Sequence, residues 1–340
     1  MLLRRLNCFG SWQLESNNEP VEPKAILVVG SINADLLAYV DDSKRIGNYA
    51  FGDDFRFNLG GKGLNQAVNV ASTGQNVILI GRVGDDFFGH EILRQLHNKG
   101  IMVNQVVKDR VGHTGIGHVR VSIDGEYSTV VINGANSFLD TDQIDRAIFQ
   151  GIDASYALMN FEILSDVVHY AAHKFRELGI QTVINLSPIA EGISYSIDSA
   201  DFLVTNENEA RAVLGVQEQS VPVLAALLKK QGAKNVIITR GSDGVYGVDA
   251  AGNEYSIERE PVEIKNTIGA GDTFLAIFTS ALNLGLTFQA SLEIANLAAA
   301  LVCTKQESFL SKEDIDQIAP EFSLNSTRPK ITHGMEHFND

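Results

Sequence analysis

Short runs of apolar residues alternate with segments of helical pattern along most of this chain. The first run, AILVV at 25–29, is followed by Gly30 and is too short for a helix. A continuous apolar run of this length is typical of a strand that is buried on both faces of a parallel sheet. Comparable runs recur at 77–80, 156–160, 182–186, 202–205 and 235–239. The alternation predicts an α/β fold with a doubly wound, mostly parallel sheet flanked by helices.

Two β-rich segments interrupt this alternation. Residues 113–133 contain two arms of β-forming residues on either side of Asp124-Gly125, which is a typical hairpin turn. Residues 38–58 mix aromatic and charged side chains and have only a weak pattern. We expect strands from both segments to form a small antiparallel β lid, which would cover a bound ligand and exclude water from it.

The polar ends of the chain predict one large domain between two tails. We expect a flexible N-terminal tail over 1–23, the domain over 24–319 and a polar C-terminal tail over 320–340. Polar residues interrupt any stretch near the N-terminus that resembles a signal peptide, so export is not expected. No run approaches the roughly 18 apolar residues of a membrane span, and we expect no membrane partner.

The charge and the cysteine content exclude several classes of function. A formal net charge of −15 argues against a nucleic-acid surface, which needs a basic patch. A small anionic ligand held by main-chain amides remains compatible with this charge. Cys8 and Cys303 are the only cysteines, too few for a disulfide framework or a cysteine metal cluster. They favour a reducing compartment, and the expected location is cytoplasmic.

A glycine-rich stretch, NTIGAGDTF at 266–274, precedes a long apolar run. The run over 274–286 predicts a buried helix, so residues 269–271 would form a tight turn with free N–H groups at its start. Such a turn binds anions. Asp272 could then accept a proton from a nucleophile that attacks a phosphorus held over those amides. The structural alternative is a helix that Asp272 caps, with glycines for close packing.

Further candidates lie at the ends of predicted strands, where open α/β sheets bind ligands. Asn33 and Asp35 could hydrogen-bond a polyol, or they could be a turn residue and a helix cap. The loop Gly60-Gly61-Lys62-Gly63 lets the backbone approach a ligand, and Lys62 and Asn65 could point at the same object. It is not a Walker loop, because glycine follows Lys62. The other candidates are Glu162, Asn185, 206–209, 239–244 and Asp272.

Two of these segments have alternative interpretations. NENE at 206–209 leads into a helix, so its acidic side chains would either interact with the helix dipole or bind a hydrated Mg²⁺. TRGSDG at 239–244 is either a plain loop or a backbone cradle for phosphates.

With these motifs identified, the chain resembles the PfkB family of carbohydrate kinases from about residue 25 to residue 316. The loop at 60–63, with Asn65 and Gln66, is similar to the family's first signature. The stretch 266–272 is similar to the second, where the family places an anion hole and the catalytic aspartate, and 206–209 is similar to its NxxE magnesium motif. The resemblance implies a ribokinase-like fold and ATP-dependent phosphorylation of a sugar.

The resemblance also implies a role for each candidate residue. Asp272 would deprotonate the primary hydroxyl of the sugar, and Gly269, Ala270 and Gly271 would form the anion hole for the transferring phosphoryl group. The sugar would be held by Asn33, Asp35, Gly61, Lys62, Asn65 and Glu162. The co-substrate ATP would be bound by Asn185, Thr239, Gly241, Gly244 and Asn296. Mg²⁺ would be bound, largely through water, by Asn206 and Glu209.

Three features depart from the family pattern. Asn266 stands where many relatives have an aspartate of a monovalent-cation site, and the loop 304–309 is short and lacks the usual glycine. These two features put K⁺ activation in doubt. Ile277 stands where the family has glycine or alanine, which would alter packing behind the anion hole. We expect an active kinase with altered or absent K⁺ dependence.

The substrate implied by the resemblance is D-ribose, with ribose 5-phosphate as the product. Two alternatives remain open: a kinase of another sugar or of a nucleoside, and a catalytically silent, sugar-binding regulatory protein. The three departures motivate the silent protein. Exposed lid edges invite pairing, and the resemblance implies a homodimer through the lid.

Overall fold

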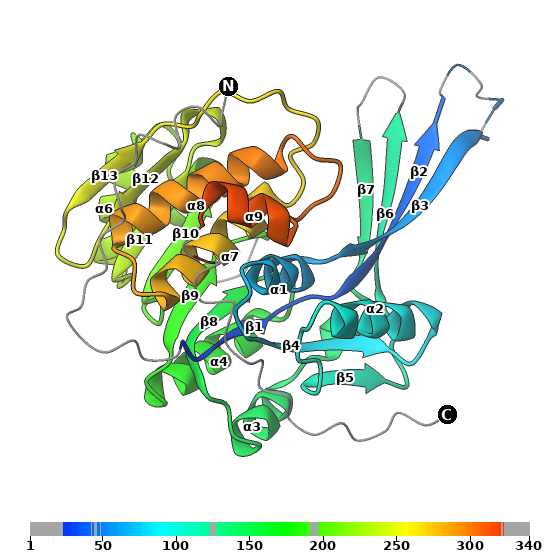
Figure 1. The fold of residues 1–340 in the computed structure, drawn as a ribbon, viewed down its shortest axis with the longest axis horizontal. Coiled ribbons are helices and arrows are strands. Elements are labelled where there is room, and N and C mark those ends of the chain that lie inside the picture. Colours follow the sequence, from blue (N-terminus) through cyan, green and yellow to red (C-terminus); the bar gives the residue numbers. More distant parts are fainter. Residues whose placement is uncertain are drawn as a thin grey trace.

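The computed structural model describes residues 23–41, 43, 46–47, 49–122, 127–190, 195, 197–320 and 322, and two sheets organise them (Figure 1). The strands of the larger sheet are β1 (Ala25–Val29), β4 (Val77–Gly84), β5 (Val106–Asp109), β8 (Ala154–Asn160), β9 (Gln181–Asn185), β10 (Phe202–Asn206), β11 (Asn235–Thr239), β12 (Val245–Val248) and β13 (Glu254–Ile257). Their order is β13-β12-β11-β10-β9-β8-β1-β4-β5.

All pairs from β11 to β5 are parallel, while β12 and β13 add antiparallel pairs at one edge. The predicted α/β fold with a mostly parallel sheet is therefore confirmed.

The helices are α1 (Lys62–Ser72), α2 (Phe87–Asn98), α3 (Thr141–Phe149), α4 (Ser165–Glu177), α5 (Glu207–Leu214), α6 (Val221–Lys230), α7 (Ala270–Asn283), α8 (Phe288–Val302) and α9 (Lys312–Ile318), with 3₁₀ helices η4 (Gly134–Phe138) and η5 (Gly241–Asp243).

Each face of the large sheet carries its own apolar core, because successive strand side chains point to opposite faces. Ile26 and Val28 of β1 pack in one core with side chains of α1, α2, α7 and α8. Leu27 and Val29 of the same strand pack in the other with side chains of α3, α4, α5 and α6. Burial on both faces explains why these strands are apolar without alternation.

The smaller sheet has the order β3-β2-β6-β7 and projects from the main body (Figure 1). It consists of β2 (Asn33–Val40), β3 (Gly52–Gly60), β6 (Gly115–Ser122) and β7 (Tyr127–Ile132). The β2–β3 and β6–β7 pairs are antiparallel, whereas β2 and β6 run parallel. This is the predicted lid sheet, although the predicted turn Asp124-Gly125 lies outside the described residues.

Several predicted boundaries differ from the structure. β2 begins at Asn33, before residue 38, so Asn33 and Asp35 are strand residues and neither is a turn residue or a helix cap. α7 begins at Ala270, because Gly269 takes the left-handed conformation of an N-cap at φ 81°. The alternative in which Asp272 caps this helix is therefore wrong, since Asp272 lies within the first turn.

The predicted tails fall largely outside the described residues, which begin at 23 and end at 322. Phe322 is 2% exposed and packs with Ile277 and Ile318, so the apolar core extends beyond residue 319. Within the described ranges, no helix is both long enough and apolar enough to cross a membrane.

Candidate active site

Neighbouring strand ends bring many of the predicted site residues to one edge of the large sheet. Asn160 at the end of β8 lies beside Asn185 of β9, and Asn206 at the end of β10 lies beside Thr239 of β11. At the same edge β1 ends and the chain passes through residues 30–32 into lid strand β2. The candidate site lies between this edge and the base of the lid.

The Asp272 side chain is buried in the first turn of α7, with 5% of its surface exposed. Its Oδ1 accepts a hydrogen bond from Gln66 Nε2 at 3.0 Å. Burial raises the pKa of the Asp272 carboxyl and the Glu162 charge adds to this, while the Lys62 ammonium and bonds from Gln66 and Asn65 partly offset the effect. A carboxyl with a raised pKa is a stronger proton acceptor once it is ionised.

Lys62 places a positive charge beside Asp272. Burial disfavours its ammonium, but the carboxylates of Asp272, Glu162 and Glu209 outweigh burial and raise the pKa of Lys62. Glu162 Oε2 accepts the Lys62 main-chain N–H at 2.9 Å and the Ser31 hydroxyl at 2.5 Å. The Lys62 side chain is therefore charged at neutral pH, close to the predicted base.

A chain of buried polar side chains connects Asp272 to Glu162. Gln66 donates to Asp272 and its Oε1 accepts from Asn160 Nδ2 at 3.4 Å. Asn160 Oδ1 in turn accepts the Glu162 main-chain N–H at 3.1 Å. Gln66 and Asn160 were not predicted as site residues, and only the position of Gln66 in the first glycine motif signalled a role.

The Asp35 carboxylate is enclosed by the lid strands on either side of it. A Cβ added at Gly60 of β3 would lie 2.2 Å from this carboxyl group, and one at Gly117 of β6 would lie 2.3 Å from Asp35 Oδ1. Only glycine therefore leaves room for the carboxylate at both positions. Burial, followed by the Glu162 charge, raises the pKa of Asp35 to about 7.

The other predicted sugar residues are Asn33, Gly61 and Asn65, and Gly61 lies close to the backbone of Ser31 and Asn33. Asn33 is 5% exposed, and its Oδ1 accepts from Asn136 Nδ2 at 2.7 Å. Gly61 is the N-cap of α1 at φ 88°, and a Cβ there would lie 2.8 Å from the Ser31 carbonyl oxygen. Asn65 Oδ1 is buried and has no hydrogen-bond partner in the part of the chain that the structure describes. An unpaired buried acceptor is typical of a ligand site.

The start of α7 offers main-chain donors. Ala270 N–H donates to the Thr267 carbonyl oxygen at 3.3 Å, whereas the N–H groups of Gly271 and Asp272 bond to no other described residue. Nothing lies within 4 Å of a Cβ added at Gly271, so a ligand can approach this backbone closely. Free N–H groups at a helix start bind anions.

The predicted nucleotide residues lie on other elements. Asn185 Nδ2 donates to the Val204 carbonyl oxygen at 3.4 Å, and Thr239 Oγ1 donates to that of Thr205 at 3.3 Å. Gly241 is the first residue of η5 and Gly244 follows its end, with φ of 56° and 87°. Asn296 Nδ2 of α8 donates to the Glu258 carbonyl oxygen at 2.9 Å. No hydrogen bond between described residues joins this set to Asp272.

Asn206 and Glu209 form a reciprocal capping box at the start of α5. Asn206 Oδ1 accepts the Glu209 N–H, and Glu209 Oε2 accepts the Asn206 N–H, each at 2.9 Å. The helix-cap interpretation of this motif is thus part of its role. Over the described ranges, no three or more His, Cys, Asp or Glu side chains are grouped as metal ligands.

Asn266 connects the second glycine stretch to the loop at 304–309. Its Oδ1 accepts the Ile268 N–H at 2.9 Å, and its Nδ2 donates to the Gln306 carbonyl oxygen at 3.2 Å. Ile277 is fully buried in the cluster that includes Ile294 of α8 and Ile315 of α9. The amide of Asn266 therefore uses the Gln306 carbonyl oxygen as an acceptor.

A cavity of about 560 Å³ lies at the opposite edge of the large sheet, where several strands begin. Its lining includes Tyr156, Phe202 and Phe288. None of the predicted site residues lines it, so it is separate from the candidate active site.

The chain is similar to known proteins over most of its length. The model of the pfkB family carbohydrate kinases matches residues 23–315. A ribokinase from Bacillus subtilis (strain 168) is 34% identical over 282 residues, which is 82% of this chain and 93% of the relative. A deoxyribokinase from Salmonella typhi is 29% identical over 304 residues, 88% of this chain and 99% of the relative. The crystal structure of a Thermotoga maritima ribokinase matches with a TM-score of 0.79 at 25% identity, over 87% of this chain and 99% of that one.

The fold, the site and these matches define an ATP-dependent sugar kinase. The fold is ribokinase-like, as the sequence motifs implied. The chain belongs to the PfkB family of carbohydrate kinases, which its sequence resembles over most of its length.

Proposed function

We propose that this kinase transfers the γ-phosphoryl group of ATP to the primary hydroxyl of D-ribose and so forms ribose 5-phosphate. The observation that carries this proposal is the buried Asp272 carboxylate in the first turn of α7, next to Gly271, whose N–H bonds to no other described residue. A proton acceptor and an anion-binding helix start are thereby adjacent. Transfer of a phosphoryl group to an alcohol requires both.

In the proposed reaction, Asp272 takes the proton of the sugar hydroxyl while the hydroxyl oxygen attacks the γ-phosphorus in line. The bond from this phosphorus to the β,γ-bridging oxygen breaks, and ADP leaves. The N–H groups at the start of α7 stabilise the charge that spreads over the phosphoryl oxygens. The sugar hydroxyls bind the side chains or backbone of Asn33, Asp35, Gly61, Lys62, Asn65 and Glu162. The unpaired Oδ1 of Asn65 supports this assignment, because a bound hydroxyl would satisfy it.

We further propose that the nucleotide lies over the strand ends occupied by Asn185, Thr239, Gly241 and Gly244, with Asn296 on the adenine side. Asn206 and Glu209 suit Mg²⁺ held through water, because the capping box leaves them few oxygens for direct ligation. Mg²⁺ commonly keeps several waters and binds one or two carboxylates together with substrate phosphates. Bound there, it would neutralise phosphate charge during transfer.

The choice of sugar is tested by a panel of substrates in a coupled assay of ADP release. The panel contains D-ribose, 2-deoxy-D-ribose, D-fructose and inosine, since relatives of this chain include both a ribokinase and a deoxyribokinase. We expect the highest kcat/KM with D-ribose. A higher kcat/KM with 2-deoxy-D-ribose or inosine would overturn the choice of ribose. If calorimetry shows sugar binding but no ADP forms under any Mg²⁺ or K⁺ condition, the protein is a silent binding protein.

The same assay tests monovalent-cation dependence. We expect little or no activation by K⁺, because the Asn266 amide carries no charge and occupies the Gln306 carbonyl oxygen. Asn266→Asp keeps an acceptor for the Ile268 N–H and frees that carbonyl oxygen. It should increase activation by K⁺ relative to the wild type, and strong K⁺ activation of the wild type would contradict this expectation.

We also propose that the kinase is a cytoplasmic homodimer that pairs through the lid. Large exposed apolar side chains on and beside the lid strands support the pairing, namely Phe51, Phe55, Val130, Val131 and Ile132. The low cysteine content supports a reducing compartment.

A further inference from the structure

Asn136 of η4 is a buried side chain, 2% exposed, that contacts the junction between β1 and β2. Its Oδ1 accepts the main-chain N–H of Ile32 at 2.9 Å. Its Nδ2 donates to the Ile32 carbonyl oxygen at 3.2 Å and to Asn33 Oδ1 at 2.7 Å. One amide group thus holds both the backbone and a side chain where the lid begins.

These contacts determine the positions of the oxygen and the NH₂ group in the side-chain amides of Asn136 and Asn33. A main-chain N–H can only donate, so the atom of Asn136 next to Ile32 N must be oxygen. The other end of Asn136 is then the NH₂ group, and the atom of Asn33 that it meets must be oxygen as well. Asn33 is left with its Nδ2 free of any hydrogen bond to the described residues. The backbone of Ile32 therefore determines the polarity that Asn33 presents.

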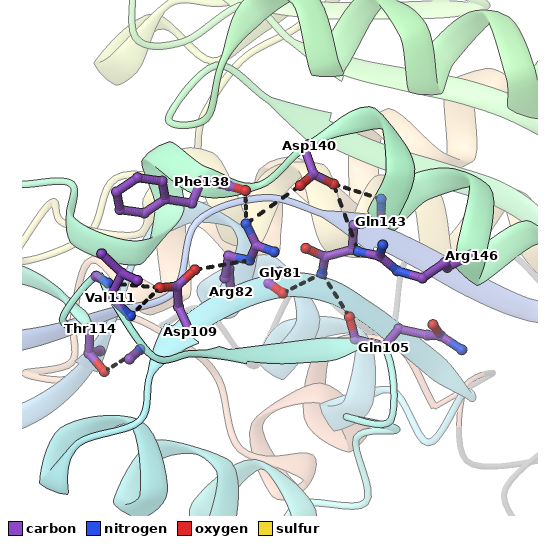
Figure 2. A network of polar contacts seen from close by, with 12 residues as sticks. Gly81, Arg82, Gln105, Asp109, Val111, Thr114, Phe138, Asp140, Gln143 and Arg146 are labelled. Atoms are coloured by element: carbon purple, nitrogen blue, oxygen red, sulfur yellow. Dashed lines mark hydrogen bonds and ion pairs between the residues drawn. The ribbon is translucent and has the colours of Figure 1, made fainter.

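η4 has little freedom to release this arrangement. Figure 2 shows the Arg82 guanidinium donating to the Phe138 carbonyl oxygen, with Asp109 and Asp140 on either side of it. At the other end of η4, Ala135 N–H donates to the His113 carbonyl oxygen at 2.7 Å. The 3₁₀ turn is therefore held at both ends.

The neighbouring lid strand leaves no space for the two amides to move toward it. A Cβ added at Gly115 of β6 would lie 2.1 Å from Asn33 Oδ1 and 2.4 Å from Asn136 Nδ2. The two amides are thus packed against bare backbone, and the pair cannot shift toward β6.

We propose that Asn136 is a positioning residue that makes Asn33 a hydrogen-bond donor toward the sugar. This inference rests on the proposed function, because it takes Asn33 as a sugar contact. Asp35, two residues along β2, lies on the same face of the strand and offers a carboxylate. The lid base thereby presents a donor and an acceptor side by side, which suits hydroxyl groups that both accept and donate.

The test replaces the donor end of Asn136 without changing its size. In Asn136→Asp the carboxylate still accepts from Ile32 N–H, but it can donate neither to Asn33 Oδ1 nor to the Ile32 carbonyl oxygen. Two oxygens would then meet at 2.7 Å unless the Asn33 amide turns over and presents its Oδ1 to the sugar. We expect the KM and the calorimetric Kd for the sugar to rise at least about tenfold, with kcat and the KM for ATP nearly unchanged.

Two further variants keep the inference testable if Asn136→Asp folds poorly. Asn33→Asp leaves Asn136 intact and places an acceptor toward the sugar, so it should raise the sugar KM by a similar factor. Asn283→Asp is the matched control, because Asn283 Nδ2 also donates two hydrogen bonds, to the Lys24 carbonyl oxygen and to Gln75 Oε1, far from the site. It should lower the melting temperature without changing the sugar KM.

The outcomes separate this inference from the proposed function. Failure of the wild type to phosphorylate any sugar overturns the proposed function. If the wild type is active and folded Asn136→Asp or Asn33→Asp has the wild-type sugar KM and Kd, the inference about Asn136 is wrong. It is equally wrong if kcat falls and the KM values for sugar and ATP change together, since that pattern indicates a general structural defect.

Discussion

Asp272 and Lys62 carry opposite charges close together in the candidate site, where Asp272 is buried and Lys62 is partly buried. Each group changes the pKa of the other. The Lys62 ammonium opposes the rise in the pKa of Asp272, and the Asp272 carboxylate raises the pKa of Lys62 and so helps to keep it charged. Gln66 touches Asp272 directly and has no charge of its own. It is therefore the residue through which the base can be adjusted without removing it.

Replacing Gln66 with glutamate should move the acidic limb of the kcat–pH profile to higher pH. The new carboxylate would replace an amide donor 3.0 Å from Asp272 Oδ1, and a like charge there raises the apparent pKa of the pair. Because the base must be ionised, we expect the limb to move by about one pH unit or more. Gln66→Leu is the control, since it removes the donor and adds no charge, and its limb should move less. An identical profile in the wild type and Gln66→Glu would contradict the contact.

Asp35 should make the ligand-free protein less stable as the pH rises from about 4 to about 7. The pKa of its carboxyl is about 7 in the folded protein and about 3.9 in an unfolded chain. Between these values the folded state keeps a proton that the unfolded state has lost, so stability falls by at most ~1.4 kcal/mol per pH unit. In urea unfolding, the wild type should lose stability relative to Asp35→Asn across this range. If the stabilities of the wild type and Asp35→Asn change equally with pH over this range, Asp35 does not have this raised pKa.

Sequence motifs predicted the charged residues of the site better than the neutral residues that orient them. Asp272, Lys62 and Glu162 occur at motif positions or strand ends, where chemistry can be inferred from residue type. Asn136 and Asn160 gave no such signal, because their partners lie 103 and 94 positions away in the sequence. Contacts of that range depend on the packing of the sheet, which local patterns do not specify.

At the scale of elements, the start of α7 contains two glycines with different requirements. Gly269 has φ 81°, and a Cβ there would lie 2.3 Å from the Ser308 carbonyl oxygen. Gly271 is helical, and a Cβ there meets nothing within 4 Å. The first glycine is needed by the fold, whereas the second leaves space above the helix start for a ligand.

The two alanine variants should therefore behave differently. Gly269→Ala should destabilise the protein by about 1–3 kcal/mol, because of left-handed strain and the clash with Ser308. Gly271→Ala should raise stability by up to ~1 kcal/mol, since alanine favours a helix, yet it should lower kcat by crowding the phosphoryl group. Urea unfolding measures the stability of both variants, and steady-state kinetics measures their kcat. Equal destabilisation of the two, or full activity of Gly271→Ala, would contradict the division between them.

The strands of the large sheet were predicted from sequence more readily than those of the lid. A strand such as β1, buried on both faces, must be apolar throughout, and such runs are visible locally. β3 is exposed along most of its length, so its side chains follow no apolar pattern. The start of β2 at Asn33 has a different cause: polar residues just after β1 resemble a turn, and pairing with β3 and β6 makes them a strand.

At the scale of the whole molecule, the lid is the surface expected to pair with a second copy. Phe55 of β3 is 62% exposed. Phe55→Glu should convert a dimer to a monomer in sedimentation velocity at micromolar concentration, because it places charge on the apolar lid face. Phe149→Glu on α3, a phenylalanine 92% exposed on another element, should leave the dimer intact. A monomeric wild type would contradict pairing through the lid.

We propose that Asp272 acts as the base in phosphoryl transfer to a sugar hydroxyl, and the Asp272→Asn variant tests this role. Asparagine has nearly the same shape and keeps an oxygen for the Gln66 donor, so the site should remain assembled. We expect kcat with ATP and D-ribose to fall by about 10²–10⁴-fold, while sugar binding measured by calorimetry stays nearly unchanged. A variant that turns over at the wild-type rate would contradict the claim.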